Sequence, residues 1–151
     1  MNAEMSVRES LGSDHEAINR ALSDLANAVE GADFATILQV FRDVDRGLRA
    51  HMYGEERYLF QDFEASHPDD VRQLREDHDR LHRKLGELMI QTELHTLRKE
   101  SIDAFIEELR SHAAKENVTL YQWADEPLHE AQRDALFAFL EERRAALRDR
   151  V

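Results

Sequence analysis

The chain has 151 residues, no cysteine, eight histidines and a formal net charge of −12. A single domain of this size can bury about two-thirds of the surface that its unfolded chain exposes. Because it has only five glycines and two prolines, the sequence favours long helices over a β-sandwich or barrel, which needs frequent turns. The absence of cysteine excludes disulfides, thiolate metal sites, iron–sulfur clusters and cysteine nucleophiles.

Charge and hydropathy also limit the partners. The strongly acidic balance disfavours nucleic acid and anionic membranes. No apolar run approaches the roughly 18 residues that span a bilayer, and the polar start MNAEMSVRES does not resemble a signal peptide. We therefore expect a cytoplasmic protein that is a monomer or a homodimer.

Apolar residues at helical spacing predict two helices in the first part of the chain. The first opens at Ser13, where Glu16 completes a capping-box pattern, and it ends at Gly31-Ala32-Asp33. The second begins at Phe34 and ends at Ser66-His67-Pro68, with an unbroken spacing of three and four residues. The core-facing stripes of these helices contain four residues with polar side-chain groups: His15, His51, Glu55 and Tyr58.

Three further helices are predicted. Pro68 opens the third, since proline is favoured in a first helical turn, and a weaker break near His95-Thr96 separates the third from the fourth. Glu126-Pro127 introduces a fifth segment, which we expect to cover the bundle or to form a dimer contact. The predicted fold is all-α: an up-down-up-down antiparallel four-helix bundle over about 13–123 and a short C-terminal helix over about 127–149, in one domain (1–151).

Three helices carry a pair of ligand-type residues four positions apart, a spacing that places both side chains on one face. In an antiparallel hairpin, residues at one level are equally far from the turn. The midpoints between successive sites fall at residues 34, 66.5 and 97, within about two residues of the predicted turns. Seven polar side chains are therefore expected at one level of the core: His15, His51, Glu55, His78, His82, His112 and Glu116.

Such a buried polar layer needs neutralisation. One unpaired buried charge costs several kcal/mol, a large share of a domain's stability of about 5–15 kcal/mol. The stripes hold no Lys or Arg to pair with the two glutamates. Bound cations are the simplest solution, and imidazoles with carboxylates suit Fe or Mn, with Zn as a further candidate. For two metals of roughly six-coordinate geometry, bridging carboxylates and a bridging oxide or hydroxide leave one position open for a small ligand such as O2, NO or peroxide.

The residues around these positions resemble the hemerythrin family, in its bacterial HHE branch. The resemblance rests on the segments SDHEAI, HMYGEERYLF, HDRLH and HAAKE and covers roughly residues 11–123. It implies a non-haem di-iron centre, oxo- or hydroxo-bridged, with Mn or Zn as substitute ions. Carried over residue by residue, His78, His82 and His112 would ligate one iron, His15 and His51 the other, and Glu55 and Glu116 would bridge them, with the open position on the two-histidine iron.

The implied function is binding of O2 or a related small ligand, peroxide or NO, as a carrier or sensor. Oxygen-carrying hemerythrins place an Asp five residues after the last histidine, where this chain has Asn117. Glu116 instead matches HHE relatives, many of which are not simple oxygen carriers. The alternatives are a di-iron enzyme that decomposes peroxide or oxidises a reductant, an iron-buffering or storage protein, a haem held between two histidines, and a metal-free interaction module.

Other residues near the motifs receive structural roles. Three histidines fit no ligand spacing and are expected at the solvated surface: His67, His95 and His129. Tyr121 and Trp123 are expected to pack in the core or at the bundle end rather than to relay electrons, and Glu56 is the alternative to Glu55 as a bridge. Candidate partners of the imidazoles are Asp14, Asp77 and Asp79.

Overall fold

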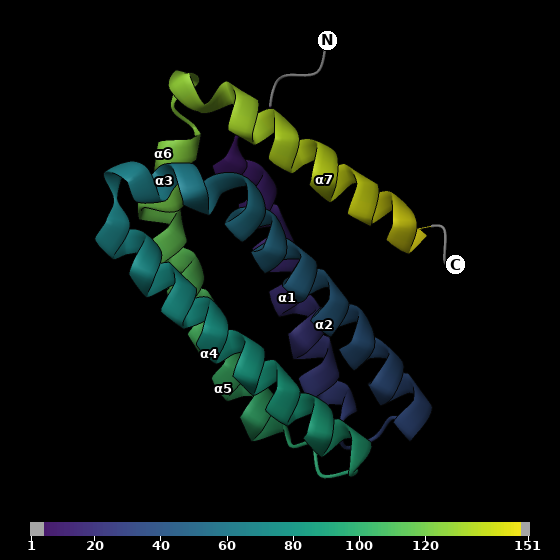
Figure 1. Ribbon diagram of the computed structural model, residues 1–151. Helices are drawn as coiled ribbons and strands as arrows, with labels where there is room; N and C mark the ends of the chain where they lie inside the picture. The colour runs from purple at the N-terminus through teal and green to yellow at the C-terminus, as the bar shows by residue number, and fades with distance from the viewer. Residues whose placement is uncertain (1–4, 149–151) are drawn as a thin grey trace.

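The computed structural model describes residues 5–148, and within that range it contains helices and no strand. The elements in chain order are α1 (Val7–Ala28), α2 (Phe34–Glu55), the π-helical turn η1 (Glu56–Phe60), α3 (Gln61–Ser66), α4 (Pro68–Glu93), α5 (Lys99–Val118), α6 (Leu120–Ala124), the 3-10 turn η2 (Pro127–His129) and α7 (Glu130–Arg148). Helices α1, α2, α4 and α5 lie side by side, and α7 lies outside them (Figure 1). The prediction of an all-α protein is confirmed.

Helix α1 begins six residues before the predicted start at Ser13, so that boundary was wrong. Ser6 caps the helix by accepting a 3.0 Å hydrogen bond from the backbone N–H of Glu9. This Ser-x-x-Glu pattern competes with the one at Ser13, and it prevails because Val7 and Leu11 extend the apolar stripe and are fully buried. The first turn is also tied to the far end of the chain, since the Val7 N–H donates to Asp125 Oδ1 at 2.6 Å.

The second predicted helix ends at Ser66 as expected, but the π-helical turn η1 divides it directly after Glu55. A π turn adds a residue to the helical repeat and shifts every later position around the axis. The buried residues of this turn are consequently Leu59 and Phe60. Tyr58, predicted on the core face, instead lies partly exposed and packs against Phe139 of α7 at a ring distance of 5.5 Å.

The remaining boundaries follow the predicted breaks, with one addition. Helix α4 begins at Pro68, as predicted, and the turn before α5 contains His95 with φ of 59°, a conformation uncommon for a residue other than glycine. The His95 ring stacks on Phe34 at 3.9 Å, a contact that helps to hold this turn. The fourth predicted helix is interrupted at Thr119 (φ −118°, ψ −84°), where α5 ends and the short helix α6 begins.

Helix α7 has 19 residues and, with the 3-10 turn η2 before it, occupies the region predicted for the C-terminal helix, about 127–149. It packs against α2 and η1, as predicted for a segment that covers the bundle. Leu136 and Leu140 of α7 are buried. Gly54 of α2 allows the close approach, because a Cβ at this position would lie 3.1 Å from Leu136 Cδ1. The ring of Phe139 in α7 contacts the rings of Tyr53 and Tyr58.

Two apolar clusters fill the space among the helices. Cluster 1 includes Leu22 of α1, Leu48 of α2, Leu85 of α4 and Leu109 of α5. Cluster 2 is formed by α1, α4 and α7 together with η1, α3 and α6, the elements that follow α2 and α5, and includes Leu11, Phe60, Leu74, Leu120 and Leu136. Each long helix carries a buried histidine whose position in the sequence lies between residues of cluster 1 and residues of cluster 2: His15, His51, His78 and His112.

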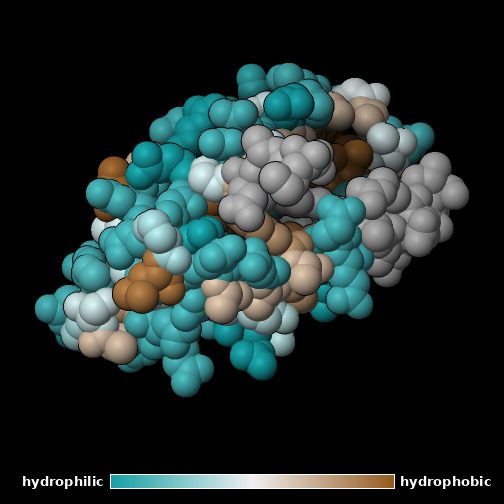
Figure 2. All heavy atoms as spheres, turned by 90° about the horizontal axis from the view of Figure 1, so that it is seen from above, coloured by the Kyte–Doolittle hydropathy of each residue, from teal (hydrophilic) through white to brown (hydrophobic). Residues whose placement is uncertain are grey.

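The surface is predominantly hydrophilic, as the acidic composition requires. Viewed from the end where α6 and the start of α7 lie, polar residues dominate and hydrophobic ones form small separate patches (Figure 2). Among residues 5–148, no helix is long and apolar enough to cross a bilayer.

Candidate metal centre

The four long helices bring six of the seven predicted ligands together between clusters 1 and 2. Each of the six is at most 5% exposed. Their ligand atoms form two groups, and within each group all atoms lie within 4.8 Å of one another. The two groups share both carboxylates, an arrangement suited to two adjacent cations with bridging glutamates. The first group is His15, His51, Glu55 and Glu116, and the second is Glu55, His78, His112 and Glu116.

Inward-facing atoms of this layer lack hydrogen-bond partners. The unpartnered atoms include Nε2 of His78 and His112, Oε1 of Glu55 and Oε2 of Glu116. His78 Nε2 is 3.3 Å from Glu55 Oε1, and His112 Nε2 is 3.2 Å from Glu116 Oε1. Buried polar atoms without partners are costly, and a cation satisfies several of them at once. The donor set and its unpartnered atoms therefore fit a metal that accepts nitrogen and oxygen ligands.

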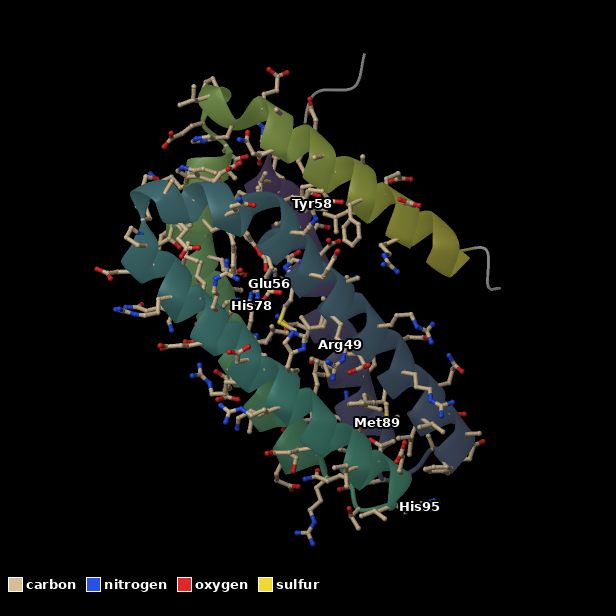
Figure 3. All side chains as sticks on the ribbon, viewed as in Figure 1. Arg49, Glu56, Tyr58, His78, Met89 and His95 are labelled. Carbon is tan, nitrogen blue, oxygen red and sulfur yellow. The ribbon has the colours of Figure 1, made fainter. Side chains whose placement is uncertain are left out.

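Carboxylates on the outer side bond two of the imidazoles, and a third carboxylate lies near another. The Nδ1 of His112 lies 3.0 Å from Asp77 Oδ2, and the Nδ1 of His78 lies 3.0 Å from Glu56 Oε1 (Figure 3). Asp14 Oδ2 lies 3.7 Å from His51 Nδ1. Metal-ligating histidines commonly donate their second N–H to a carboxylate, which fixes the ring and leaves the other nitrogen for the metal. Of the candidates predicted from the sequence, Asp77 bonds an imidazole and Asp14 lies near one, whereas Glu56, predicted as an alternative bridge, contacts His78 from the outer side.

Asp77 connects this centre to the surface of the bundle. Its carboxylate accepts from His112 and also contacts Lys115 Nζ at 3.0 Å and Arg80 Nη2 at 2.9 Å. Burial disfavours the charged carboxylate, but the bonds to His112 and Lys115 outweigh burial and lower the pKa of Asp77. A permanently charged acceptor is therefore present behind the His112 ring.

His82 is the predicted ligand that joins neither group. It is half-buried on α4, and its Nδ1 accepts a 3.0 Å hydrogen bond from Arg49 Nη1 of α2. Partial burial and the Arg49 charge lower the pKa of His82, so the ring is neutral at pH 7. A neutral ring that accepts through Nδ1 carries its proton on Nε2. Metal binding through Nε2 and the Arg49 hydrogen bond therefore exclude each other.

Tyr121 is the site residue that the sequence analysis missed. Its hydroxyl lies 2.7 Å from Glu55 Oε2, 3.1 Å from Glu116 Oε1 and 3.0 Å from His15 Nε2. It is also 3.4 Å from His51 Nε2, so this one oxygen touches every member of the first group. Burial and the two carboxylates raise the pKa of Tyr121 well above its ordinary value. The phenol is protonated, and its one proton is within reach of either carboxylate.

Without a metal, the layer holds opposite charges in contact. Burial opposes the charge on His51, but Glu55 and Asp14 outweigh it and raise the pKa of His51 to about 10. Burial likewise opposes the charge on His78, and contacts with Glu116 and Glu55 raise its pKa to about 12. Burial favours the neutral form of Glu116, yet the adjacent His112 holds its pKa well below the ordinary value.

The three remaining histidines have separate surroundings. His67 and His95 are exposed, as predicted. The prediction of a surface role for His129 was wrong, because its ring is buried and stacks on Trp123 at 3.8 Å. Its Nδ1 also lies 2.7 Å from the carbonyl oxygen of Trp123. Trp123 belongs to cluster 2, so the His129 ring packs beside that cluster, a contact between η2 and α6 that spacing along one helix does not reveal.

The sequence was compared with protein families, curated proteins and solved structures. Residues 7–124 match the family described as Hemerythrin HHE cation binding domain. Searches of curated proteins and of solved structures give no significant match. The matched segment contains every residue of both ligand groups and ends at the last residue of α6. The chain belongs to the hemerythrin HHE cation-binding domain family.

Proposed function

We propose that this protein is a non-haem di-iron protein that binds O2 or a related small ligand, peroxide or NO, as a carrier or sensor. The observation that carries the proposal is the pair of four-residue groups that share Glu55 and Glu116. Two irons held by these groups would supply a coordination position for the small ligand. The nitrogen and oxygen donors also suit Mn or Zn, which we regard as substitute ions.

The residues of the chain have distinct roles in this proposal. Glu55 and Glu116 bridge the two ions, because each belongs to both groups. His15 and His51 serve one ion, and His78 and His112 serve the other, with His82 as a further ligand once its bond to Arg49 is broken. Tyr121 orients the two carboxylates through its hydroxyl. The apolar clusters on either side keep bulk water from the layer.

The proposal includes an up-down-up-down antiparallel arrangement of the four long helices. On α1 and α4 the cluster 2 residues precede the site histidine in sequence, whereas after α2 and α5 they occur in the elements that follow, η1, α3 and α6. This alternation supports opposite directions for successive helices. We also propose that residues 1–151 act as one domain, since the described part of α7 packs on the bundle and contributes to cluster 2.

Ligand addition to the ferrous-loaded protein tests the function. We expect O2 or NO to change the visible spectrum stoichiometrically, and the change to reverse when the gas is removed. Steady O2 evolution from added hydrogen peroxide would indicate the enzymatic alternative instead. Iron that exchanges readily with a weak chelator would indicate storage, and the proposal predicts retention because several buried atoms depend on the ion.

A further inference from the structure

A cavity of about 210 Å³ lies at the seam between α1 and α2 and is bordered by α7. Small and apolar residues form most of its wall: Ala17 and Ile18 of α1, Gly47 and Ala50 of α2, and Leu140 of α7. Its polar residues are Asp14, His51 and the exposed Arg143. The cavity opens to solvent on one side, so a small nonpolar molecule can enter it from water and contact its mostly apolar wall.

This cavity adjoins the two-histidine side of the centre. His51 itself forms part of its wall, and Asp14, which also lines it, directly precedes His15 in α1. The rings of His15 and His51 are in edge contact, with centroids 4.4 Å apart. Within the described residues, the wall includes neither His78 nor His112. A molecule in the cavity therefore contacts His51 of the first group and no histidine of the second.

We propose that this cavity is the route by which a small uncharged molecule, of the size of O2 or NO, reaches the two-histidine side of the centre. The inference rests on the proposed function. The mostly apolar wall disfavours ions, because an ion entering it would lose its hydration without gaining matched partners. A neutral diatomic molecule has little hydration to lose, so the wall selects by charge and by size.

Gly47 offers a way to close the route without touching a ligand. A Cβ built at Gly47 meets no atom within 4 Å, so a larger side chain there extends into open space. Gly86 of α4 provides a matched control, because it is also helical and half-buried, and its Cβ likewise meets nothing within 4 Å. Gly86 does not line the cavity within the described residues.

The experiment compares the wild type with Gly47→Leu and Gly86→Leu in two measurements. Xenon titration of the metal-free protein, followed by NMR, reports on the cavity alone. Stopped-flow mixing of the ferrous-loaded protein with NO reports the association rate. We expect the wild type and Gly86→Leu to behave alike, and Gly47→Leu to lose xenon binding and to bind NO at least about tenfold more slowly, a barrier increase of ~1.4 kcal/mol.

The possible outcomes distinguish failure of the proposed route from failure of the proposed function. If Gly47→Leu holds as much iron as the wild type and binds NO equally fast, the route is wrong although the function stands. Failure of the wild type to bind xenon would also overturn the route. A wild type without iron would overturn the proposed function and the route together. If Gly47→Leu fails to fold, Ala50→Leu replaces it, because Ala50 lines the same cavity one helical turn away. The same loss of xenon binding and slower NO association are expected for this variant.

Discussion

The hydroxyl of Tyr121 lies 2.7 Å from Oε2 of Glu55, the shortest of its four polar contacts in the buried layer. Tyr121 belongs to α6, and Glu55 is the last residue of α2. The contact therefore connects the helix after the Thr119 break to a glutamate of both ligand groups. In the metal-free protein, this hydroxyl donates its one proton to a buried carboxylate, with Glu55 the nearer of the two.

We predict that Tyr121→Phe lowers the free energy of unfolding of the metal-free protein by about 1–3 kcal/mol, the usual cost of leaving buried polar groups without a partner. Denaturant unfolding in the presence of a chelator measures this change. Tyr53→Phe is the control, because Tyr53 is half exposed and lies outside both ligand groups. Equal stability of Tyr121→Phe and the wild type would contradict the assigned role.

The bond between Asp77 and His112 gives a second prediction. We expect Asp77→Asn to weaken metal binding by roughly 10- to 100-fold, because the amide removes the charged acceptor that orients the His112 ring. Competition with a chelator of known affinity measures the effect. Asp79→Asn is the control, since Asp79 is exposed and lies two residues along the same helix. Equal loss of affinity in both variants would show that total charge, and not the Asp77 bond, is responsible.

The Arg49–His82 hydrogen bond competes with any metal bond of His82, which leads to a third prediction. Arg49→Gln should strengthen metal binding by about fivefold, equivalent to roughly 1 kcal/mol for one released hydrogen bond. Arg46→Gln, at a partly exposed position on the same helix that has no hydrogen bond to His82, should leave affinity unchanged. If neither Arg49→Gln nor His82→Ala alters the affinity, then His82 is not a ligand.

The raised pKa values of His51 and His78 predict how the stability of the metal-free protein depends on pH. The folded-state pKa of His51 is about 10, above its ordinary value of 6.5. The ion pairs of the charged ring therefore contribute fully below pH 6.5, and this contribution is lost as the pH rises towards about 10. Stability in a chelator, measured by denaturant unfolding, should fall across this range.

The metal-loaded protein supplies the comparison. Imidazole ligands bind metals in their deprotonated form, so loading already removes these protons. Its stability should therefore fall less between pH 6.5 and about 10 than that of the metal-free protein. A metal-free protein whose stability stayed constant or rose over this range would contradict the charged histidines.

Much of this centre could be predicted because ligand-type residues recur on the core-facing stripes of four helices. Spacing of four residues within a helix and equal distance from the turns are both readable along the chain. They place His15, His51, His78 and His112 at one level, and the structure has all four buried there. Pro68 and the Gly31 turn mark two of the helix boundaries correctly, since proline and glycine act locally on the backbone.

What escaped prediction depends on departures from a regular helix. The π turn η1 adds a residue after Glu55, which moves Tyr58 outward and Leu59 and Phe60 inward. The break at Thr119 turns α6 so that Tyr121 faces the ligand groups, although it is five residues from Glu116 and off the regular stripe. Neither Arg49 nor His129 could be assigned from spacing, because their partners belong to other elements.

Metal content per chain, measured by elemental analysis on protein produced with ample iron, tests the central claim most directly. The account predicts two irons per chain, reduced to half or less in Glu55→Ala and His78→Ala, because each replacement removes a residue of the ligand groups. His67→Ala, at an exposed position stacked on Phe63, should retain both irons. A single zinc, a haem or no metal in the wild type would contradict the di-iron centre.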